Sequence, residues 1–276
     1  WTENMEKKGE PIITEYKGVP YTKITFLPDY KRFGVDGLTY DLYSIFVKRV
    51  YDCALWFSGN MNIEMDTKKK NINLPMTVYL NDEEIECTLD NYINLYTNGE
   101  VNKEEIIIDT VNRWEVGIVL SQNHRYMQTS MVNGISTIRG GKHVDNIINQ
   151  IVKKLNEVVL KKKKKYEIKS SYVKENIWIF VKCIIEEPTF DGQTKESMTT
   201  NISNFGSKYE VSEKFIDKLV KMGLLDRIYH SIDLENSKLG KKTDGTKKES
   251  VRGIKKLDDA NFAGTKQSAK CTLILT

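Results

Sequence analysis

The chain has 276 residues, enough for one large domain or two smaller ones with a substantial core. Hydrophobic residues make up 39% and no apolar run approaches the length of a membrane span, so we expect no contact with a membrane. Its 42 basic and 38 acidic residues leave a net charge of only +4, so any case for nucleic-acid binding depends on where the lysines lie.

The four cysteines are far apart and form no Cys-x-x-Cys pair; they are Cys53, Cys87, Cys183 and Cys271. Because a zinc site needs clustered soft ligands, we expect no metal site and predict reduced, intracellular thiols. The sequence opens at Trp1 without a signal peptide and closes on a strand-like run, so we expect a piece of a longer protein.

Strand and helix patterns alternate through the first hundred residues. Alternation of apolar and polar residues predicts strands, and apolar repeats at helical spacing predict helices. The expected elements are a half-buried strand Tyr21–Leu27, a helix Tyr40–Leu55, a strand Met76–Leu80 with a turn at Asn81-Asp82, and a helix Leu89–Tyr96. Residues 60–74 look like a polar insertion, and the polar stretch 97–103 is the best candidate for a domain boundary.

The second half has stronger patterns. We predict strands at Trp114–Leu120, Tyr126–Val132 and Ile177–Ile185, a long helix opened by Gly140-Gly141, two helices at Val211–Met222 and Leu224–Leu234, and a polar mobile connector at 236–252. The long helix carries an apolar stripe made of Val144, Ile147, Ile148, Ile151, Val152, Leu155, Val158 and Val159. A face packed on a sheet is favoured over a partner-helix interface.

The loop Pro188–Glu196 follows the apolar strand Ile177–Ile185 and contains a glycine, a side-chain amide and a lysine in close succession. Such a loop can present Gln193 and Lys195 to an anion. By itself this signal is weak, because most lysine-bearing loops are ordinary surface loops.

Five consecutive lysines follow the long helix: Lys161, Lys162, Lys163, Lys164 and Lys165. They can be a solvated turn between helix and strand, where lysines suit the negative end of a helix. Alternatively they can contact the phosphates of a nucleic acid without regard to its sequence. The residues alone leave the two interpretations evenly balanced.

Several separated stretches, read together, resemble the type IIA DNA topoisomerases of the eukaryotic or large-virus kind. They are Trp1-Thr-Glu-Asn-Met5, Arg49-Val-Tyr-Asp52, Asn112-Arg-Trp-Glu-Val116, Val132–Ile138, Arg139-Gly-Gly-Lys-His-Val144, Pro188-Thr-Phe190 with Gln193-Thr-Lys-Glu196, Lys256–Asn261 with Ala263–Lys266, and Lys270–Thr276. The resemblance covers nearly the whole chain, in the family's order.

The resemblance implies an α+β, two-layer fold in three parts. Residues 1–104 resemble the C-terminal part of a GHKL ATPase domain, and its sheet is expected there. Residues 105–264 resemble the transducer domain, with a left-handed β-α-β crossover that the general right-handed rule would not predict. Residues 265–276 resemble the lead-in and first strand of the Toprim domain.

The resemblance also implies the chemistry of the loop. The lysine matching Lys195 reaches the γ-phosphate of ATP in the neighbouring ATPase domain, and its charge offsets the charge of the transition state, which makes Lys195 the candidate catalytic residue. Gln193 would donate a hydrogen bond to the same phosphate, Thr194 would position the loop, and Gly192 would let it relax. Loss of the phosphate would free the transducer to rotate, so nucleotide state would reach the DNA gate.

Double-stranded DNA is the implied partner, and the family's basic transducer loop favours the DNA interpretation of Lys161–Lys165. ATP and Mg²⁺ are implied for the full-length homodimer. The family's general base, magnesium-binding asparagine and glycine-rich loop have no counterpart in this sequence, so the fragment alone is expected to be an inactive monomer with no cofactor. A cellular eukaryotic parent would act in the nucleus, and a viral one in the nucleus or a cytoplasmic factory.

Two alternatives stay open: a non-catalytic DNA-binding or scaffold module of the same fold, or another GHKL ATPase of the mismatch-repair or chaperone type. The strand-like run Lys270–Thr276 argues against the second alternative. His143 follows the glycine pair and could be mistaken for a catalytic residue. We interpret it as a structural group at a helix N-terminus, since no nucleophile or metal partner accompanies it.

Overall fold

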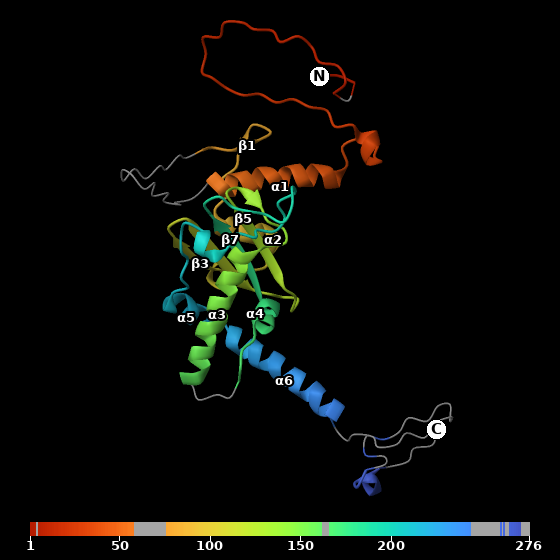
Figure 1. Ribbon diagram of the computed structural model, residues 1–276, viewed down its shortest axis with the longest axis vertical. Coiled ribbons are helices and arrows are strands. Elements are labelled where there is room, and N and C mark those ends of the chain that lie inside the picture. Colours follow the sequence, from red (N-terminus) through yellow and green to blue (C-terminus); the bar gives the residue numbers. More distant parts are fainter. Residues whose placement is uncertain are drawn as a thin grey trace, which may run out of the picture.

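The computed structural model describes residues 1–3, 5–57, 76–161, 166–243, 260, 262 and 265–271 (Figure 1). The helices are α1 Tyr40–Phe57, α2 Leu89–Tyr96, α3 Lys142–Lys161, α4 Ser170–Asn176, α5 Glu213–Lys221 and α6 Leu224–Thr243. The strands are β1 Tyr79–Leu80, β2 Glu83–Glu84, β3 Ile107–Val111, β4 Trp114–Leu120, β5 Met127–Val132, β6 Ile135–Ser136 and β7 Ile177–Cys183. Short 3₁₀ turns lie at Tyr30–Phe33, Lys103–Glu105, Ile202–Asn204 and Ser268–Lys270.

The main sheet of the described chain has the strand order β3-β4-β7-β5-β6. Its pairs are antiparallel except for β5 and β7, which run parallel with Met127 opposite Trp178. Parallel neighbours need a crossover connection, and here it is made by α3 and α4. The predicted β-α-β crossover is therefore present, and its left hand stays a prediction.

One face of the sheet packs against α3, α4, α5 and α6. The apolar stripe of α3 is buried there, with Ile147, Ile151 and Leu155 fully enclosed against β4 and β7. Each such side chain contributes roughly 1.5–3 kcal/mol by leaving water. The prediction that this stripe packs on a sheet is confirmed, and it fixes α3 along the sheet, as Figure 1 shows.

The opposite face is covered by α1 and α2. Leu55 of α1 and Ile93 of α2 pack with Val119, Met131 and Phe180 of the sheet. Residues from the first hundred and the later sheet therefore share one core. The predicted α+β class is confirmed, with helices on both faces of a mostly antiparallel sheet.

The described residues before α1, 1–3 and 5–39, do not join this core. The predicted strand Tyr21–Leu27 is wrong: the segment has no strand, and Ile24, Phe26 and Leu27 are largely exposed. A strand is held by ladder hydrogen bonds to a neighbour, and none of the described strands lies beside this segment. The expected sheet in the first part is reduced to the hairpin β1-β2, whose turn at Asn81-Asp82 was predicted.

The connector predicted from residue 236 is wrong over its first residues, because α6 continues to Thr243. The leucine and the three lysines in this stretch favour a helix once the packed N-terminal half of α6 has nucleated it. Sequence patterns also missed β3, β6 and α4. The polar insertion 60–74, the rest of the connector and the closing strand 272–276 lie outside the described residues.

Candidate functional site

The loop that contains Gln193 and Lys195 is a closed turn with an ordered base. Phe190 and Met198 form an antiparallel bridge, and the N–H of Asp191 donates to the carbonyl of Ser197 (3.1 Å). At the tip, the N–H of Lys195 donates to the carbonyl of Gly192 (3.1 Å). The tip therefore projects from a base whose two sides, at Phe190–Asp191 and Ser197–Met198, are hydrogen-bonded together.

The base of the loop is joined to the start of α3. The N–H of Met198 donates to the carbonyl of Gly140, and the N–H of Lys142 donates to the carbonyl of Met198, both at 3.0 Å. A carbonyl from the loop thus satisfies one of the N–H groups that a helix leaves free in its first turn. Gly141 lies directly beside Met198 with a φ of 138°, a conformation that favours glycine.

Arg139 joins the same two segments through its side chain. Its guanidinium contacts Asp191 on one side of the tip (Nη2–Oδ2, 3.1 Å) and Glu196 on the other (Nη1–Oε2, 3.5 Å). Its own N–H donates to the carbonyl of Glu196 (2.9 Å). The loop and the glycine pair, about fifty residues apart in sequence, therefore form one structural unit.

The tip itself is exposed, including Gly192, Gln193, Thr194 and Lys195. The ammonium of Lys195 lies 5.6 Å from the centre of the Phe190 ring, a cation–π contact. Within the described residues, no carboxylate lies within 4.0 Å of this ammonium. Lys195 has a φ of 56°, which non-glycine residues rarely adopt. A tethered loop thus presents a cation and an amide to solvent, as the sequence predicted.

His143 is a structural group. It lies in the first turn of α3, is fully buried, and its Nε2 is 3.4 Å from the hydroxyl of Thr137. Burial lowers the pKa of His143 to about 3, against the opposing influence of the Asp145 carboxylate. A neutral, enclosed imidazole at the positive end of a helix is poorly suited to exchange protons with a substrate.

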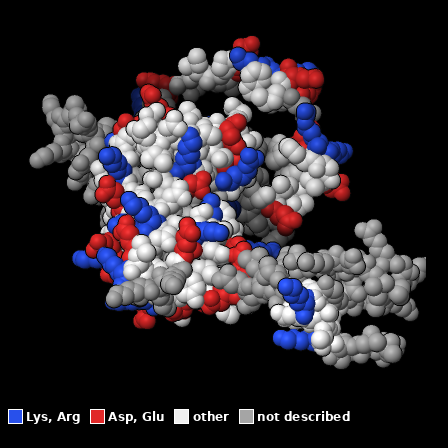
Figure 2. All heavy atoms as spheres, turned by 60° about the horizontal axis from the view of Figure 1, so that its bottom comes forward, with Lys and Arg blue, Asp and Glu red and all other residues white. Residues whose placement is uncertain are grey.

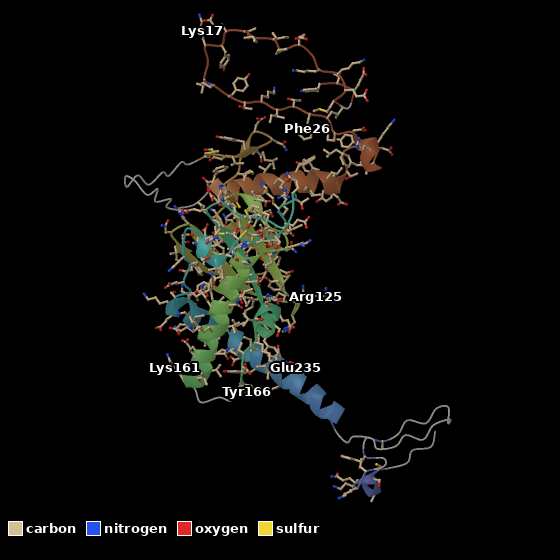
Figure 3. All side chains as sticks on the ribbon, in the orientation of Figure 1. Lys17, Phe26, Arg125, Lys161, Tyr166 and Glu235 are labelled. Carbon is tan, nitrogen blue, oxygen red and sulfur yellow. The ribbon has the colours of Figure 1, made fainter. Side chains whose placement is uncertain are left out.

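The predicted lysine run begins where α3 ends. Lys161 is the last residue of α3 and is exposed; Lys162, Lys163, Lys164 and Lys165 lie outside the described residues. In Figure 3, Lys161 lies at the end of α3 farthest from α1. The next element of the chain is α4, which precedes the strand β7, and both interpretations of the run itself stay predictions.

Figure 2 brings this end of the molecule forward. Basic and acidic side chains are interspersed over the described part of that face, with no single basic patch. Lys174, near the run in sequence, pairs with Asp145 (2.9 Å) and lies over the ring of Tyr126. Lys174 is therefore already paired within the fold.

Lys182 was missed by the sequence analysis. It lies within the run Ile177–Ile185, is 1% exposed, and donates to the carbonyl of Leu55 in the last turn of α1 (Nζ–O, 2.7 Å). Glu115 on β4 lies 3.3 Å from the same ammonium. Burial lowers the pKa of Lys182 and Glu115 opposes this shift. The sequence feature that could have pointed to Lys182 is a single charged residue inside an apolar strand, because a buried lysine needs partners.

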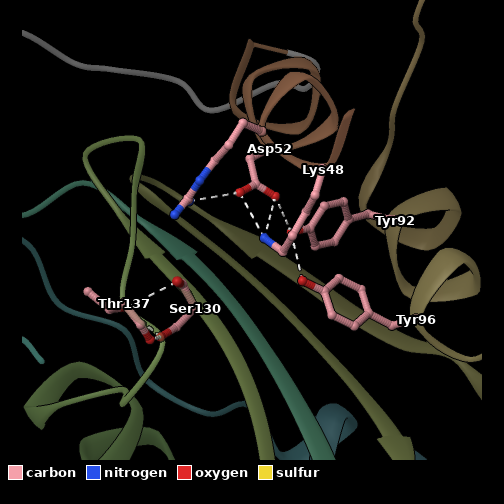
Figure 4. A network of polar contacts seen from close by, with 7 residues as sticks. Lys48, Asp52, Tyr92, Tyr96, Ser130 and Thr137 are labelled. Carbon is pink, nitrogen blue, oxygen red and sulfur yellow. Dashed lines mark hydrogen bonds and ion pairs between the residues drawn. The ribbon is translucent and has the colours of Figure 1, made fainter. Parts of the chain in front are cut away.

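A second polar network joins α1 to α2 (Figure 4). The buried carboxylate of Asp52 accepts hydrogen bonds from Lys48 (2.9 Å), Arg49 (3.2 Å) and the hydroxyl of Tyr92 (2.7 Å). Asp52 is the last residue of the Arg49–Asp52 motif noted in the sequence. The network holds α1 against α2, and through them against the sheet.

The exposed tip fits a phosphate contact, since an ammonium and an amide can both donate to phosphate oxygens. Among the described residues, no three His, Cys, Asp or Glu side chains are grouped in a way that could hold a metal ion. No helix in the described part of the chain is long and apolar enough to cross a membrane.

Comparison with known proteins gives a consistent result. The family model described as DNA gyrase B matches residues 68–248. DNA topoisomerase 2 of Saccharomyces cerevisiae is 40% identical over all of this chain and 19% of its own length. DNA topoisomerase 2 of Acanthamoeba polyphaga mimivirus is 41% identical over all of this chain and 21% of its own length.

Solved structures agree. The ATPase region of Saccharomyces cerevisiae topoisomerase II matches with a TM-score of 0.60 and 35% identity, over 75% of this chain and 48% of that one. The ATPase and transducer domains of DNA topoisomerase II from Balamuthia mandrillaris match with a TM-score of 0.59 and 27% identity, over 71% and 46% of the two chains. The chain spans about a fifth of the length of the curated relatives it matches.

Proposed function

This chain belongs to the type IIA DNA topoisomerase family, and we propose that it is the segment of an ATP-dependent, double-strand-passing enzyme that senses the γ-phosphate and passes that information to the DNA gate. The observation that supports this proposal most directly is the exposed Lys195 side chain on a loop whose base is hydrogen-bonded to α3. In this proposal residues 1–104 are the end of a GHKL ATPase domain, 105–264 the transducer, and 265–276 the start of a Toprim domain.

Lys195 is the proposed catalytic residue. ATP, held with Mg²⁺ by the rest of the enzyme, supplies the phosphoryl group. The Lys195 ammonium would lie beside its outer oxygens, where charge develops in the loose transition state of phosphoryl transfer. Gln193 would donate its side-chain amide to the same phosphate, and Thr194 would keep the turn in register. A loop with an ordered base loses little entropy when it engages, which favours the transition state.

The proposed route to DNA is α3. Its N-terminus is hydrogen-bonded to the loop, and its C-terminus is Lys161, the first lysine of the run. Twenty helical residues span about 30 Å, and the buried stripe makes α3 move together with the sheet. A change at the loop would therefore displace Lys161–Lys165, whose charges would contact the phosphates of double-stranded DNA without reading its sequence.

The proposal extends to the assembly. The full-length enzyme would be a homodimer that uses ATP and Mg²⁺, and the segment alone would be monomeric and inactive. It would act wherever its DNA is, the nucleus of a eukaryotic cell or a viral factory.

The test compares Lys195→Ala with wild type in the full-length enzyme that carries this segment. We expect a loss of at least tenfold in DNA-stimulated ATP turnover and a parallel loss of supercoil relaxation, because both depend on the same phosphate contact. Lys214→Ala, which removes an exposed lysine on α5, is the matched control and should retain both activities. Unchanged turnover in Lys195→Ala would overturn the proposal.

A further inference from the structure

The tip of the loop is flanked by two carboxylates. Asp191 lies just before Gly192, and Glu196 directly follows Lys195. Either carboxylate is close enough along the chain to pair with the Lys195 ammonium, and both would repel a phosphate. A phosphate-binding lysine between two acids is therefore in an unfavourable position unless the acids are neutralised.

Arg139 neutralises both. Its guanidinium makes ion pairs with Asp191 at 3.1 Å and with Glu196 at 3.5 Å, one on each side of the tip. The planar guanidinium has donors on several edges, so one arginine can hold two carboxylates apart. The Lys195 ammonium instead lies over the Phe190 ring.

We propose that Arg139 is a positioning residue for Lys195. It holds Asp191 and Glu196 away from the Lys195 ammonium and cancels their repulsion of the phosphate, so that Lys195 remains available to the phosphate. This inference rests on the proposed function and concerns the electrostatics of the same loop.

The backbone supports the assignment. The N–H of Arg139 donates to the carbonyl of Glu196, so the guanidinium starts from a fixed point beside the loop. The next residue, Gly140, accepts from Met198. The arginine therefore approaches the loop from the ordered start of α3.

The test uses the full-length enzyme and measures affinity for a non-hydrolysable ATP analogue relative to ADP, together with kcat and KM. We expect Arg139→Gln to lower the analogue-to-ADP affinity ratio about tenfold, and added salt to recover part of the loss by screening the freed carboxylates. Arg139→Lys keeps one positive charge and should retain most of the ratio.

The deciding variant combines Arg139→Gln with Asp191→Asn and Glu196→Gln. If Arg139 acts by neutralising the carboxylates, removing them restores the affinity ratio to within about threefold of wild type. Failure of this rescue, or no effect of Arg139→Gln alone, would overturn the inference.

Two further measurements make the test decisive even if Arg139→Gln does not fold. If Arg139→Gln does not fold, the pair Asp191→Asn with Glu196→Gln in the wild-type background is measured instead. It should keep the affinity ratio, and losing it would contradict the inference. Lys195→Ala separates the proposed function from the role of Arg139. An unchanged affinity ratio in Lys195→Ala would overturn the proposed function itself. A lowered ratio in Lys195→Ala with an unchanged ratio in Arg139→Gln would overturn only the role of Arg139.

Discussion

Gly141 and Met198 are in such close contact that a Cβ atom on residue 141 would overlap the carbonyl oxygen and the amide nitrogen of Met198. Two backbone hydrogen bonds beside this contact, Met198 N–H to the carbonyl of Gly140 and Lys142 N–H to the carbonyl of Met198, join the loop Pro188–Glu196 to α3. Glycine at position 141 is therefore required by the approach of another backbone, which sequence spacing alone does not reveal.

Gly141→Ala should break this junction. The added methyl group meets backbone atoms that cannot rotate away, and a φ of 138° is unfavourable for alanine, so the free energy of unfolding should fall by about 3 kcal/mol. Chemical denaturation measures the change. Gly192→Ala is the matched control: a Cβ there would meet nothing within 4 Å, and stability should change by less than about 0.5 kcal/mol.

Stability should also depend on the proton of His143. Burial lowers its pKa in the folded state to about 3, whereas an unfolded histidine titrates near 6.5. Between these values the unfolded state binds the extra proton, so the free energy of unfolding should fall as the pH falls from 6.5. Protonation of this one histidine in the unfolded state should lower the free energy of unfolding by about 2 kcal/mol at pH 5.

Denaturation of wild type and His143→Gln between pH 7 and 5 tests this dependence. Whatever the stability of His143→Gln at pH 7, its free energy of unfolding should fall less than that of wild type as the pH is lowered, because residue 143 no longer titrates. His230→Gln removes an exposed histidine and serves as the matched control. Identical declines in wild type and His143→Gln would show that the imidazole is not held neutral by the fold.

Lys182→Met should destabilise the contact between α1 and the sheet. The substitution keeps the apolar stem but leaves the Leu55 carbonyl and the Glu115 carboxylate without this donor, at a cost of about 2–4 kcal/mol. Thermal or denaturant unfolding measures the loss, and the exposed Lys153→Met is the matched control. Adding Glu115→Gln should recover part of the loss, and no recovery would assign the cost to packing and to the Leu55 carbonyl rather than to the Glu115 charge.

The long, strongly patterned elements could be predicted because their own residues specify them. The helix over Leu89–Tyr96 and the strand over Trp114–Leu120 have the predicted bounds, and α3 begins directly after its glycine pair. These segments carry a complete apolar face. Their local pattern and their packing therefore favour the same structure.

Elements that depend on partners could not be predicted. α4 has only seven residues, too few for a stable isolated helix, and it forms because Val173 and Asn176 are buried beside α3 and α6. Conversely, Tyr21–Leu27 has a strand pattern but no described strand to pair with. In both cases the deciding contacts come from distant parts of the chain.

In the candidate site too, local residues could be predicted from the sequence, whereas residues that depend on distant partners could not. Gln193 and Lys195 could be proposed from a short motif, because their residue types suit a phosphate. Arg139 could not, because its carboxylate partners lie 52 and 57 residues away and only the fold brings them together. Lys182 could have been proposed, since a lysine inside an apolar strand requires an explanation.

The most direct test of phosphate sensing is the ratio of affinities for a non-hydrolysable ATP analogue and for ADP, measured in wild type and Lys195→Ala of the full-length enzyme. The two ligands differ at the γ-phosphate, where Lys195 is proposed to act. We predict that Lys195→Ala lowers the ratio about tenfold or more while the affinity for ADP stays the same. An unchanged ratio would contradict the claim that this loop senses the γ-phosphate.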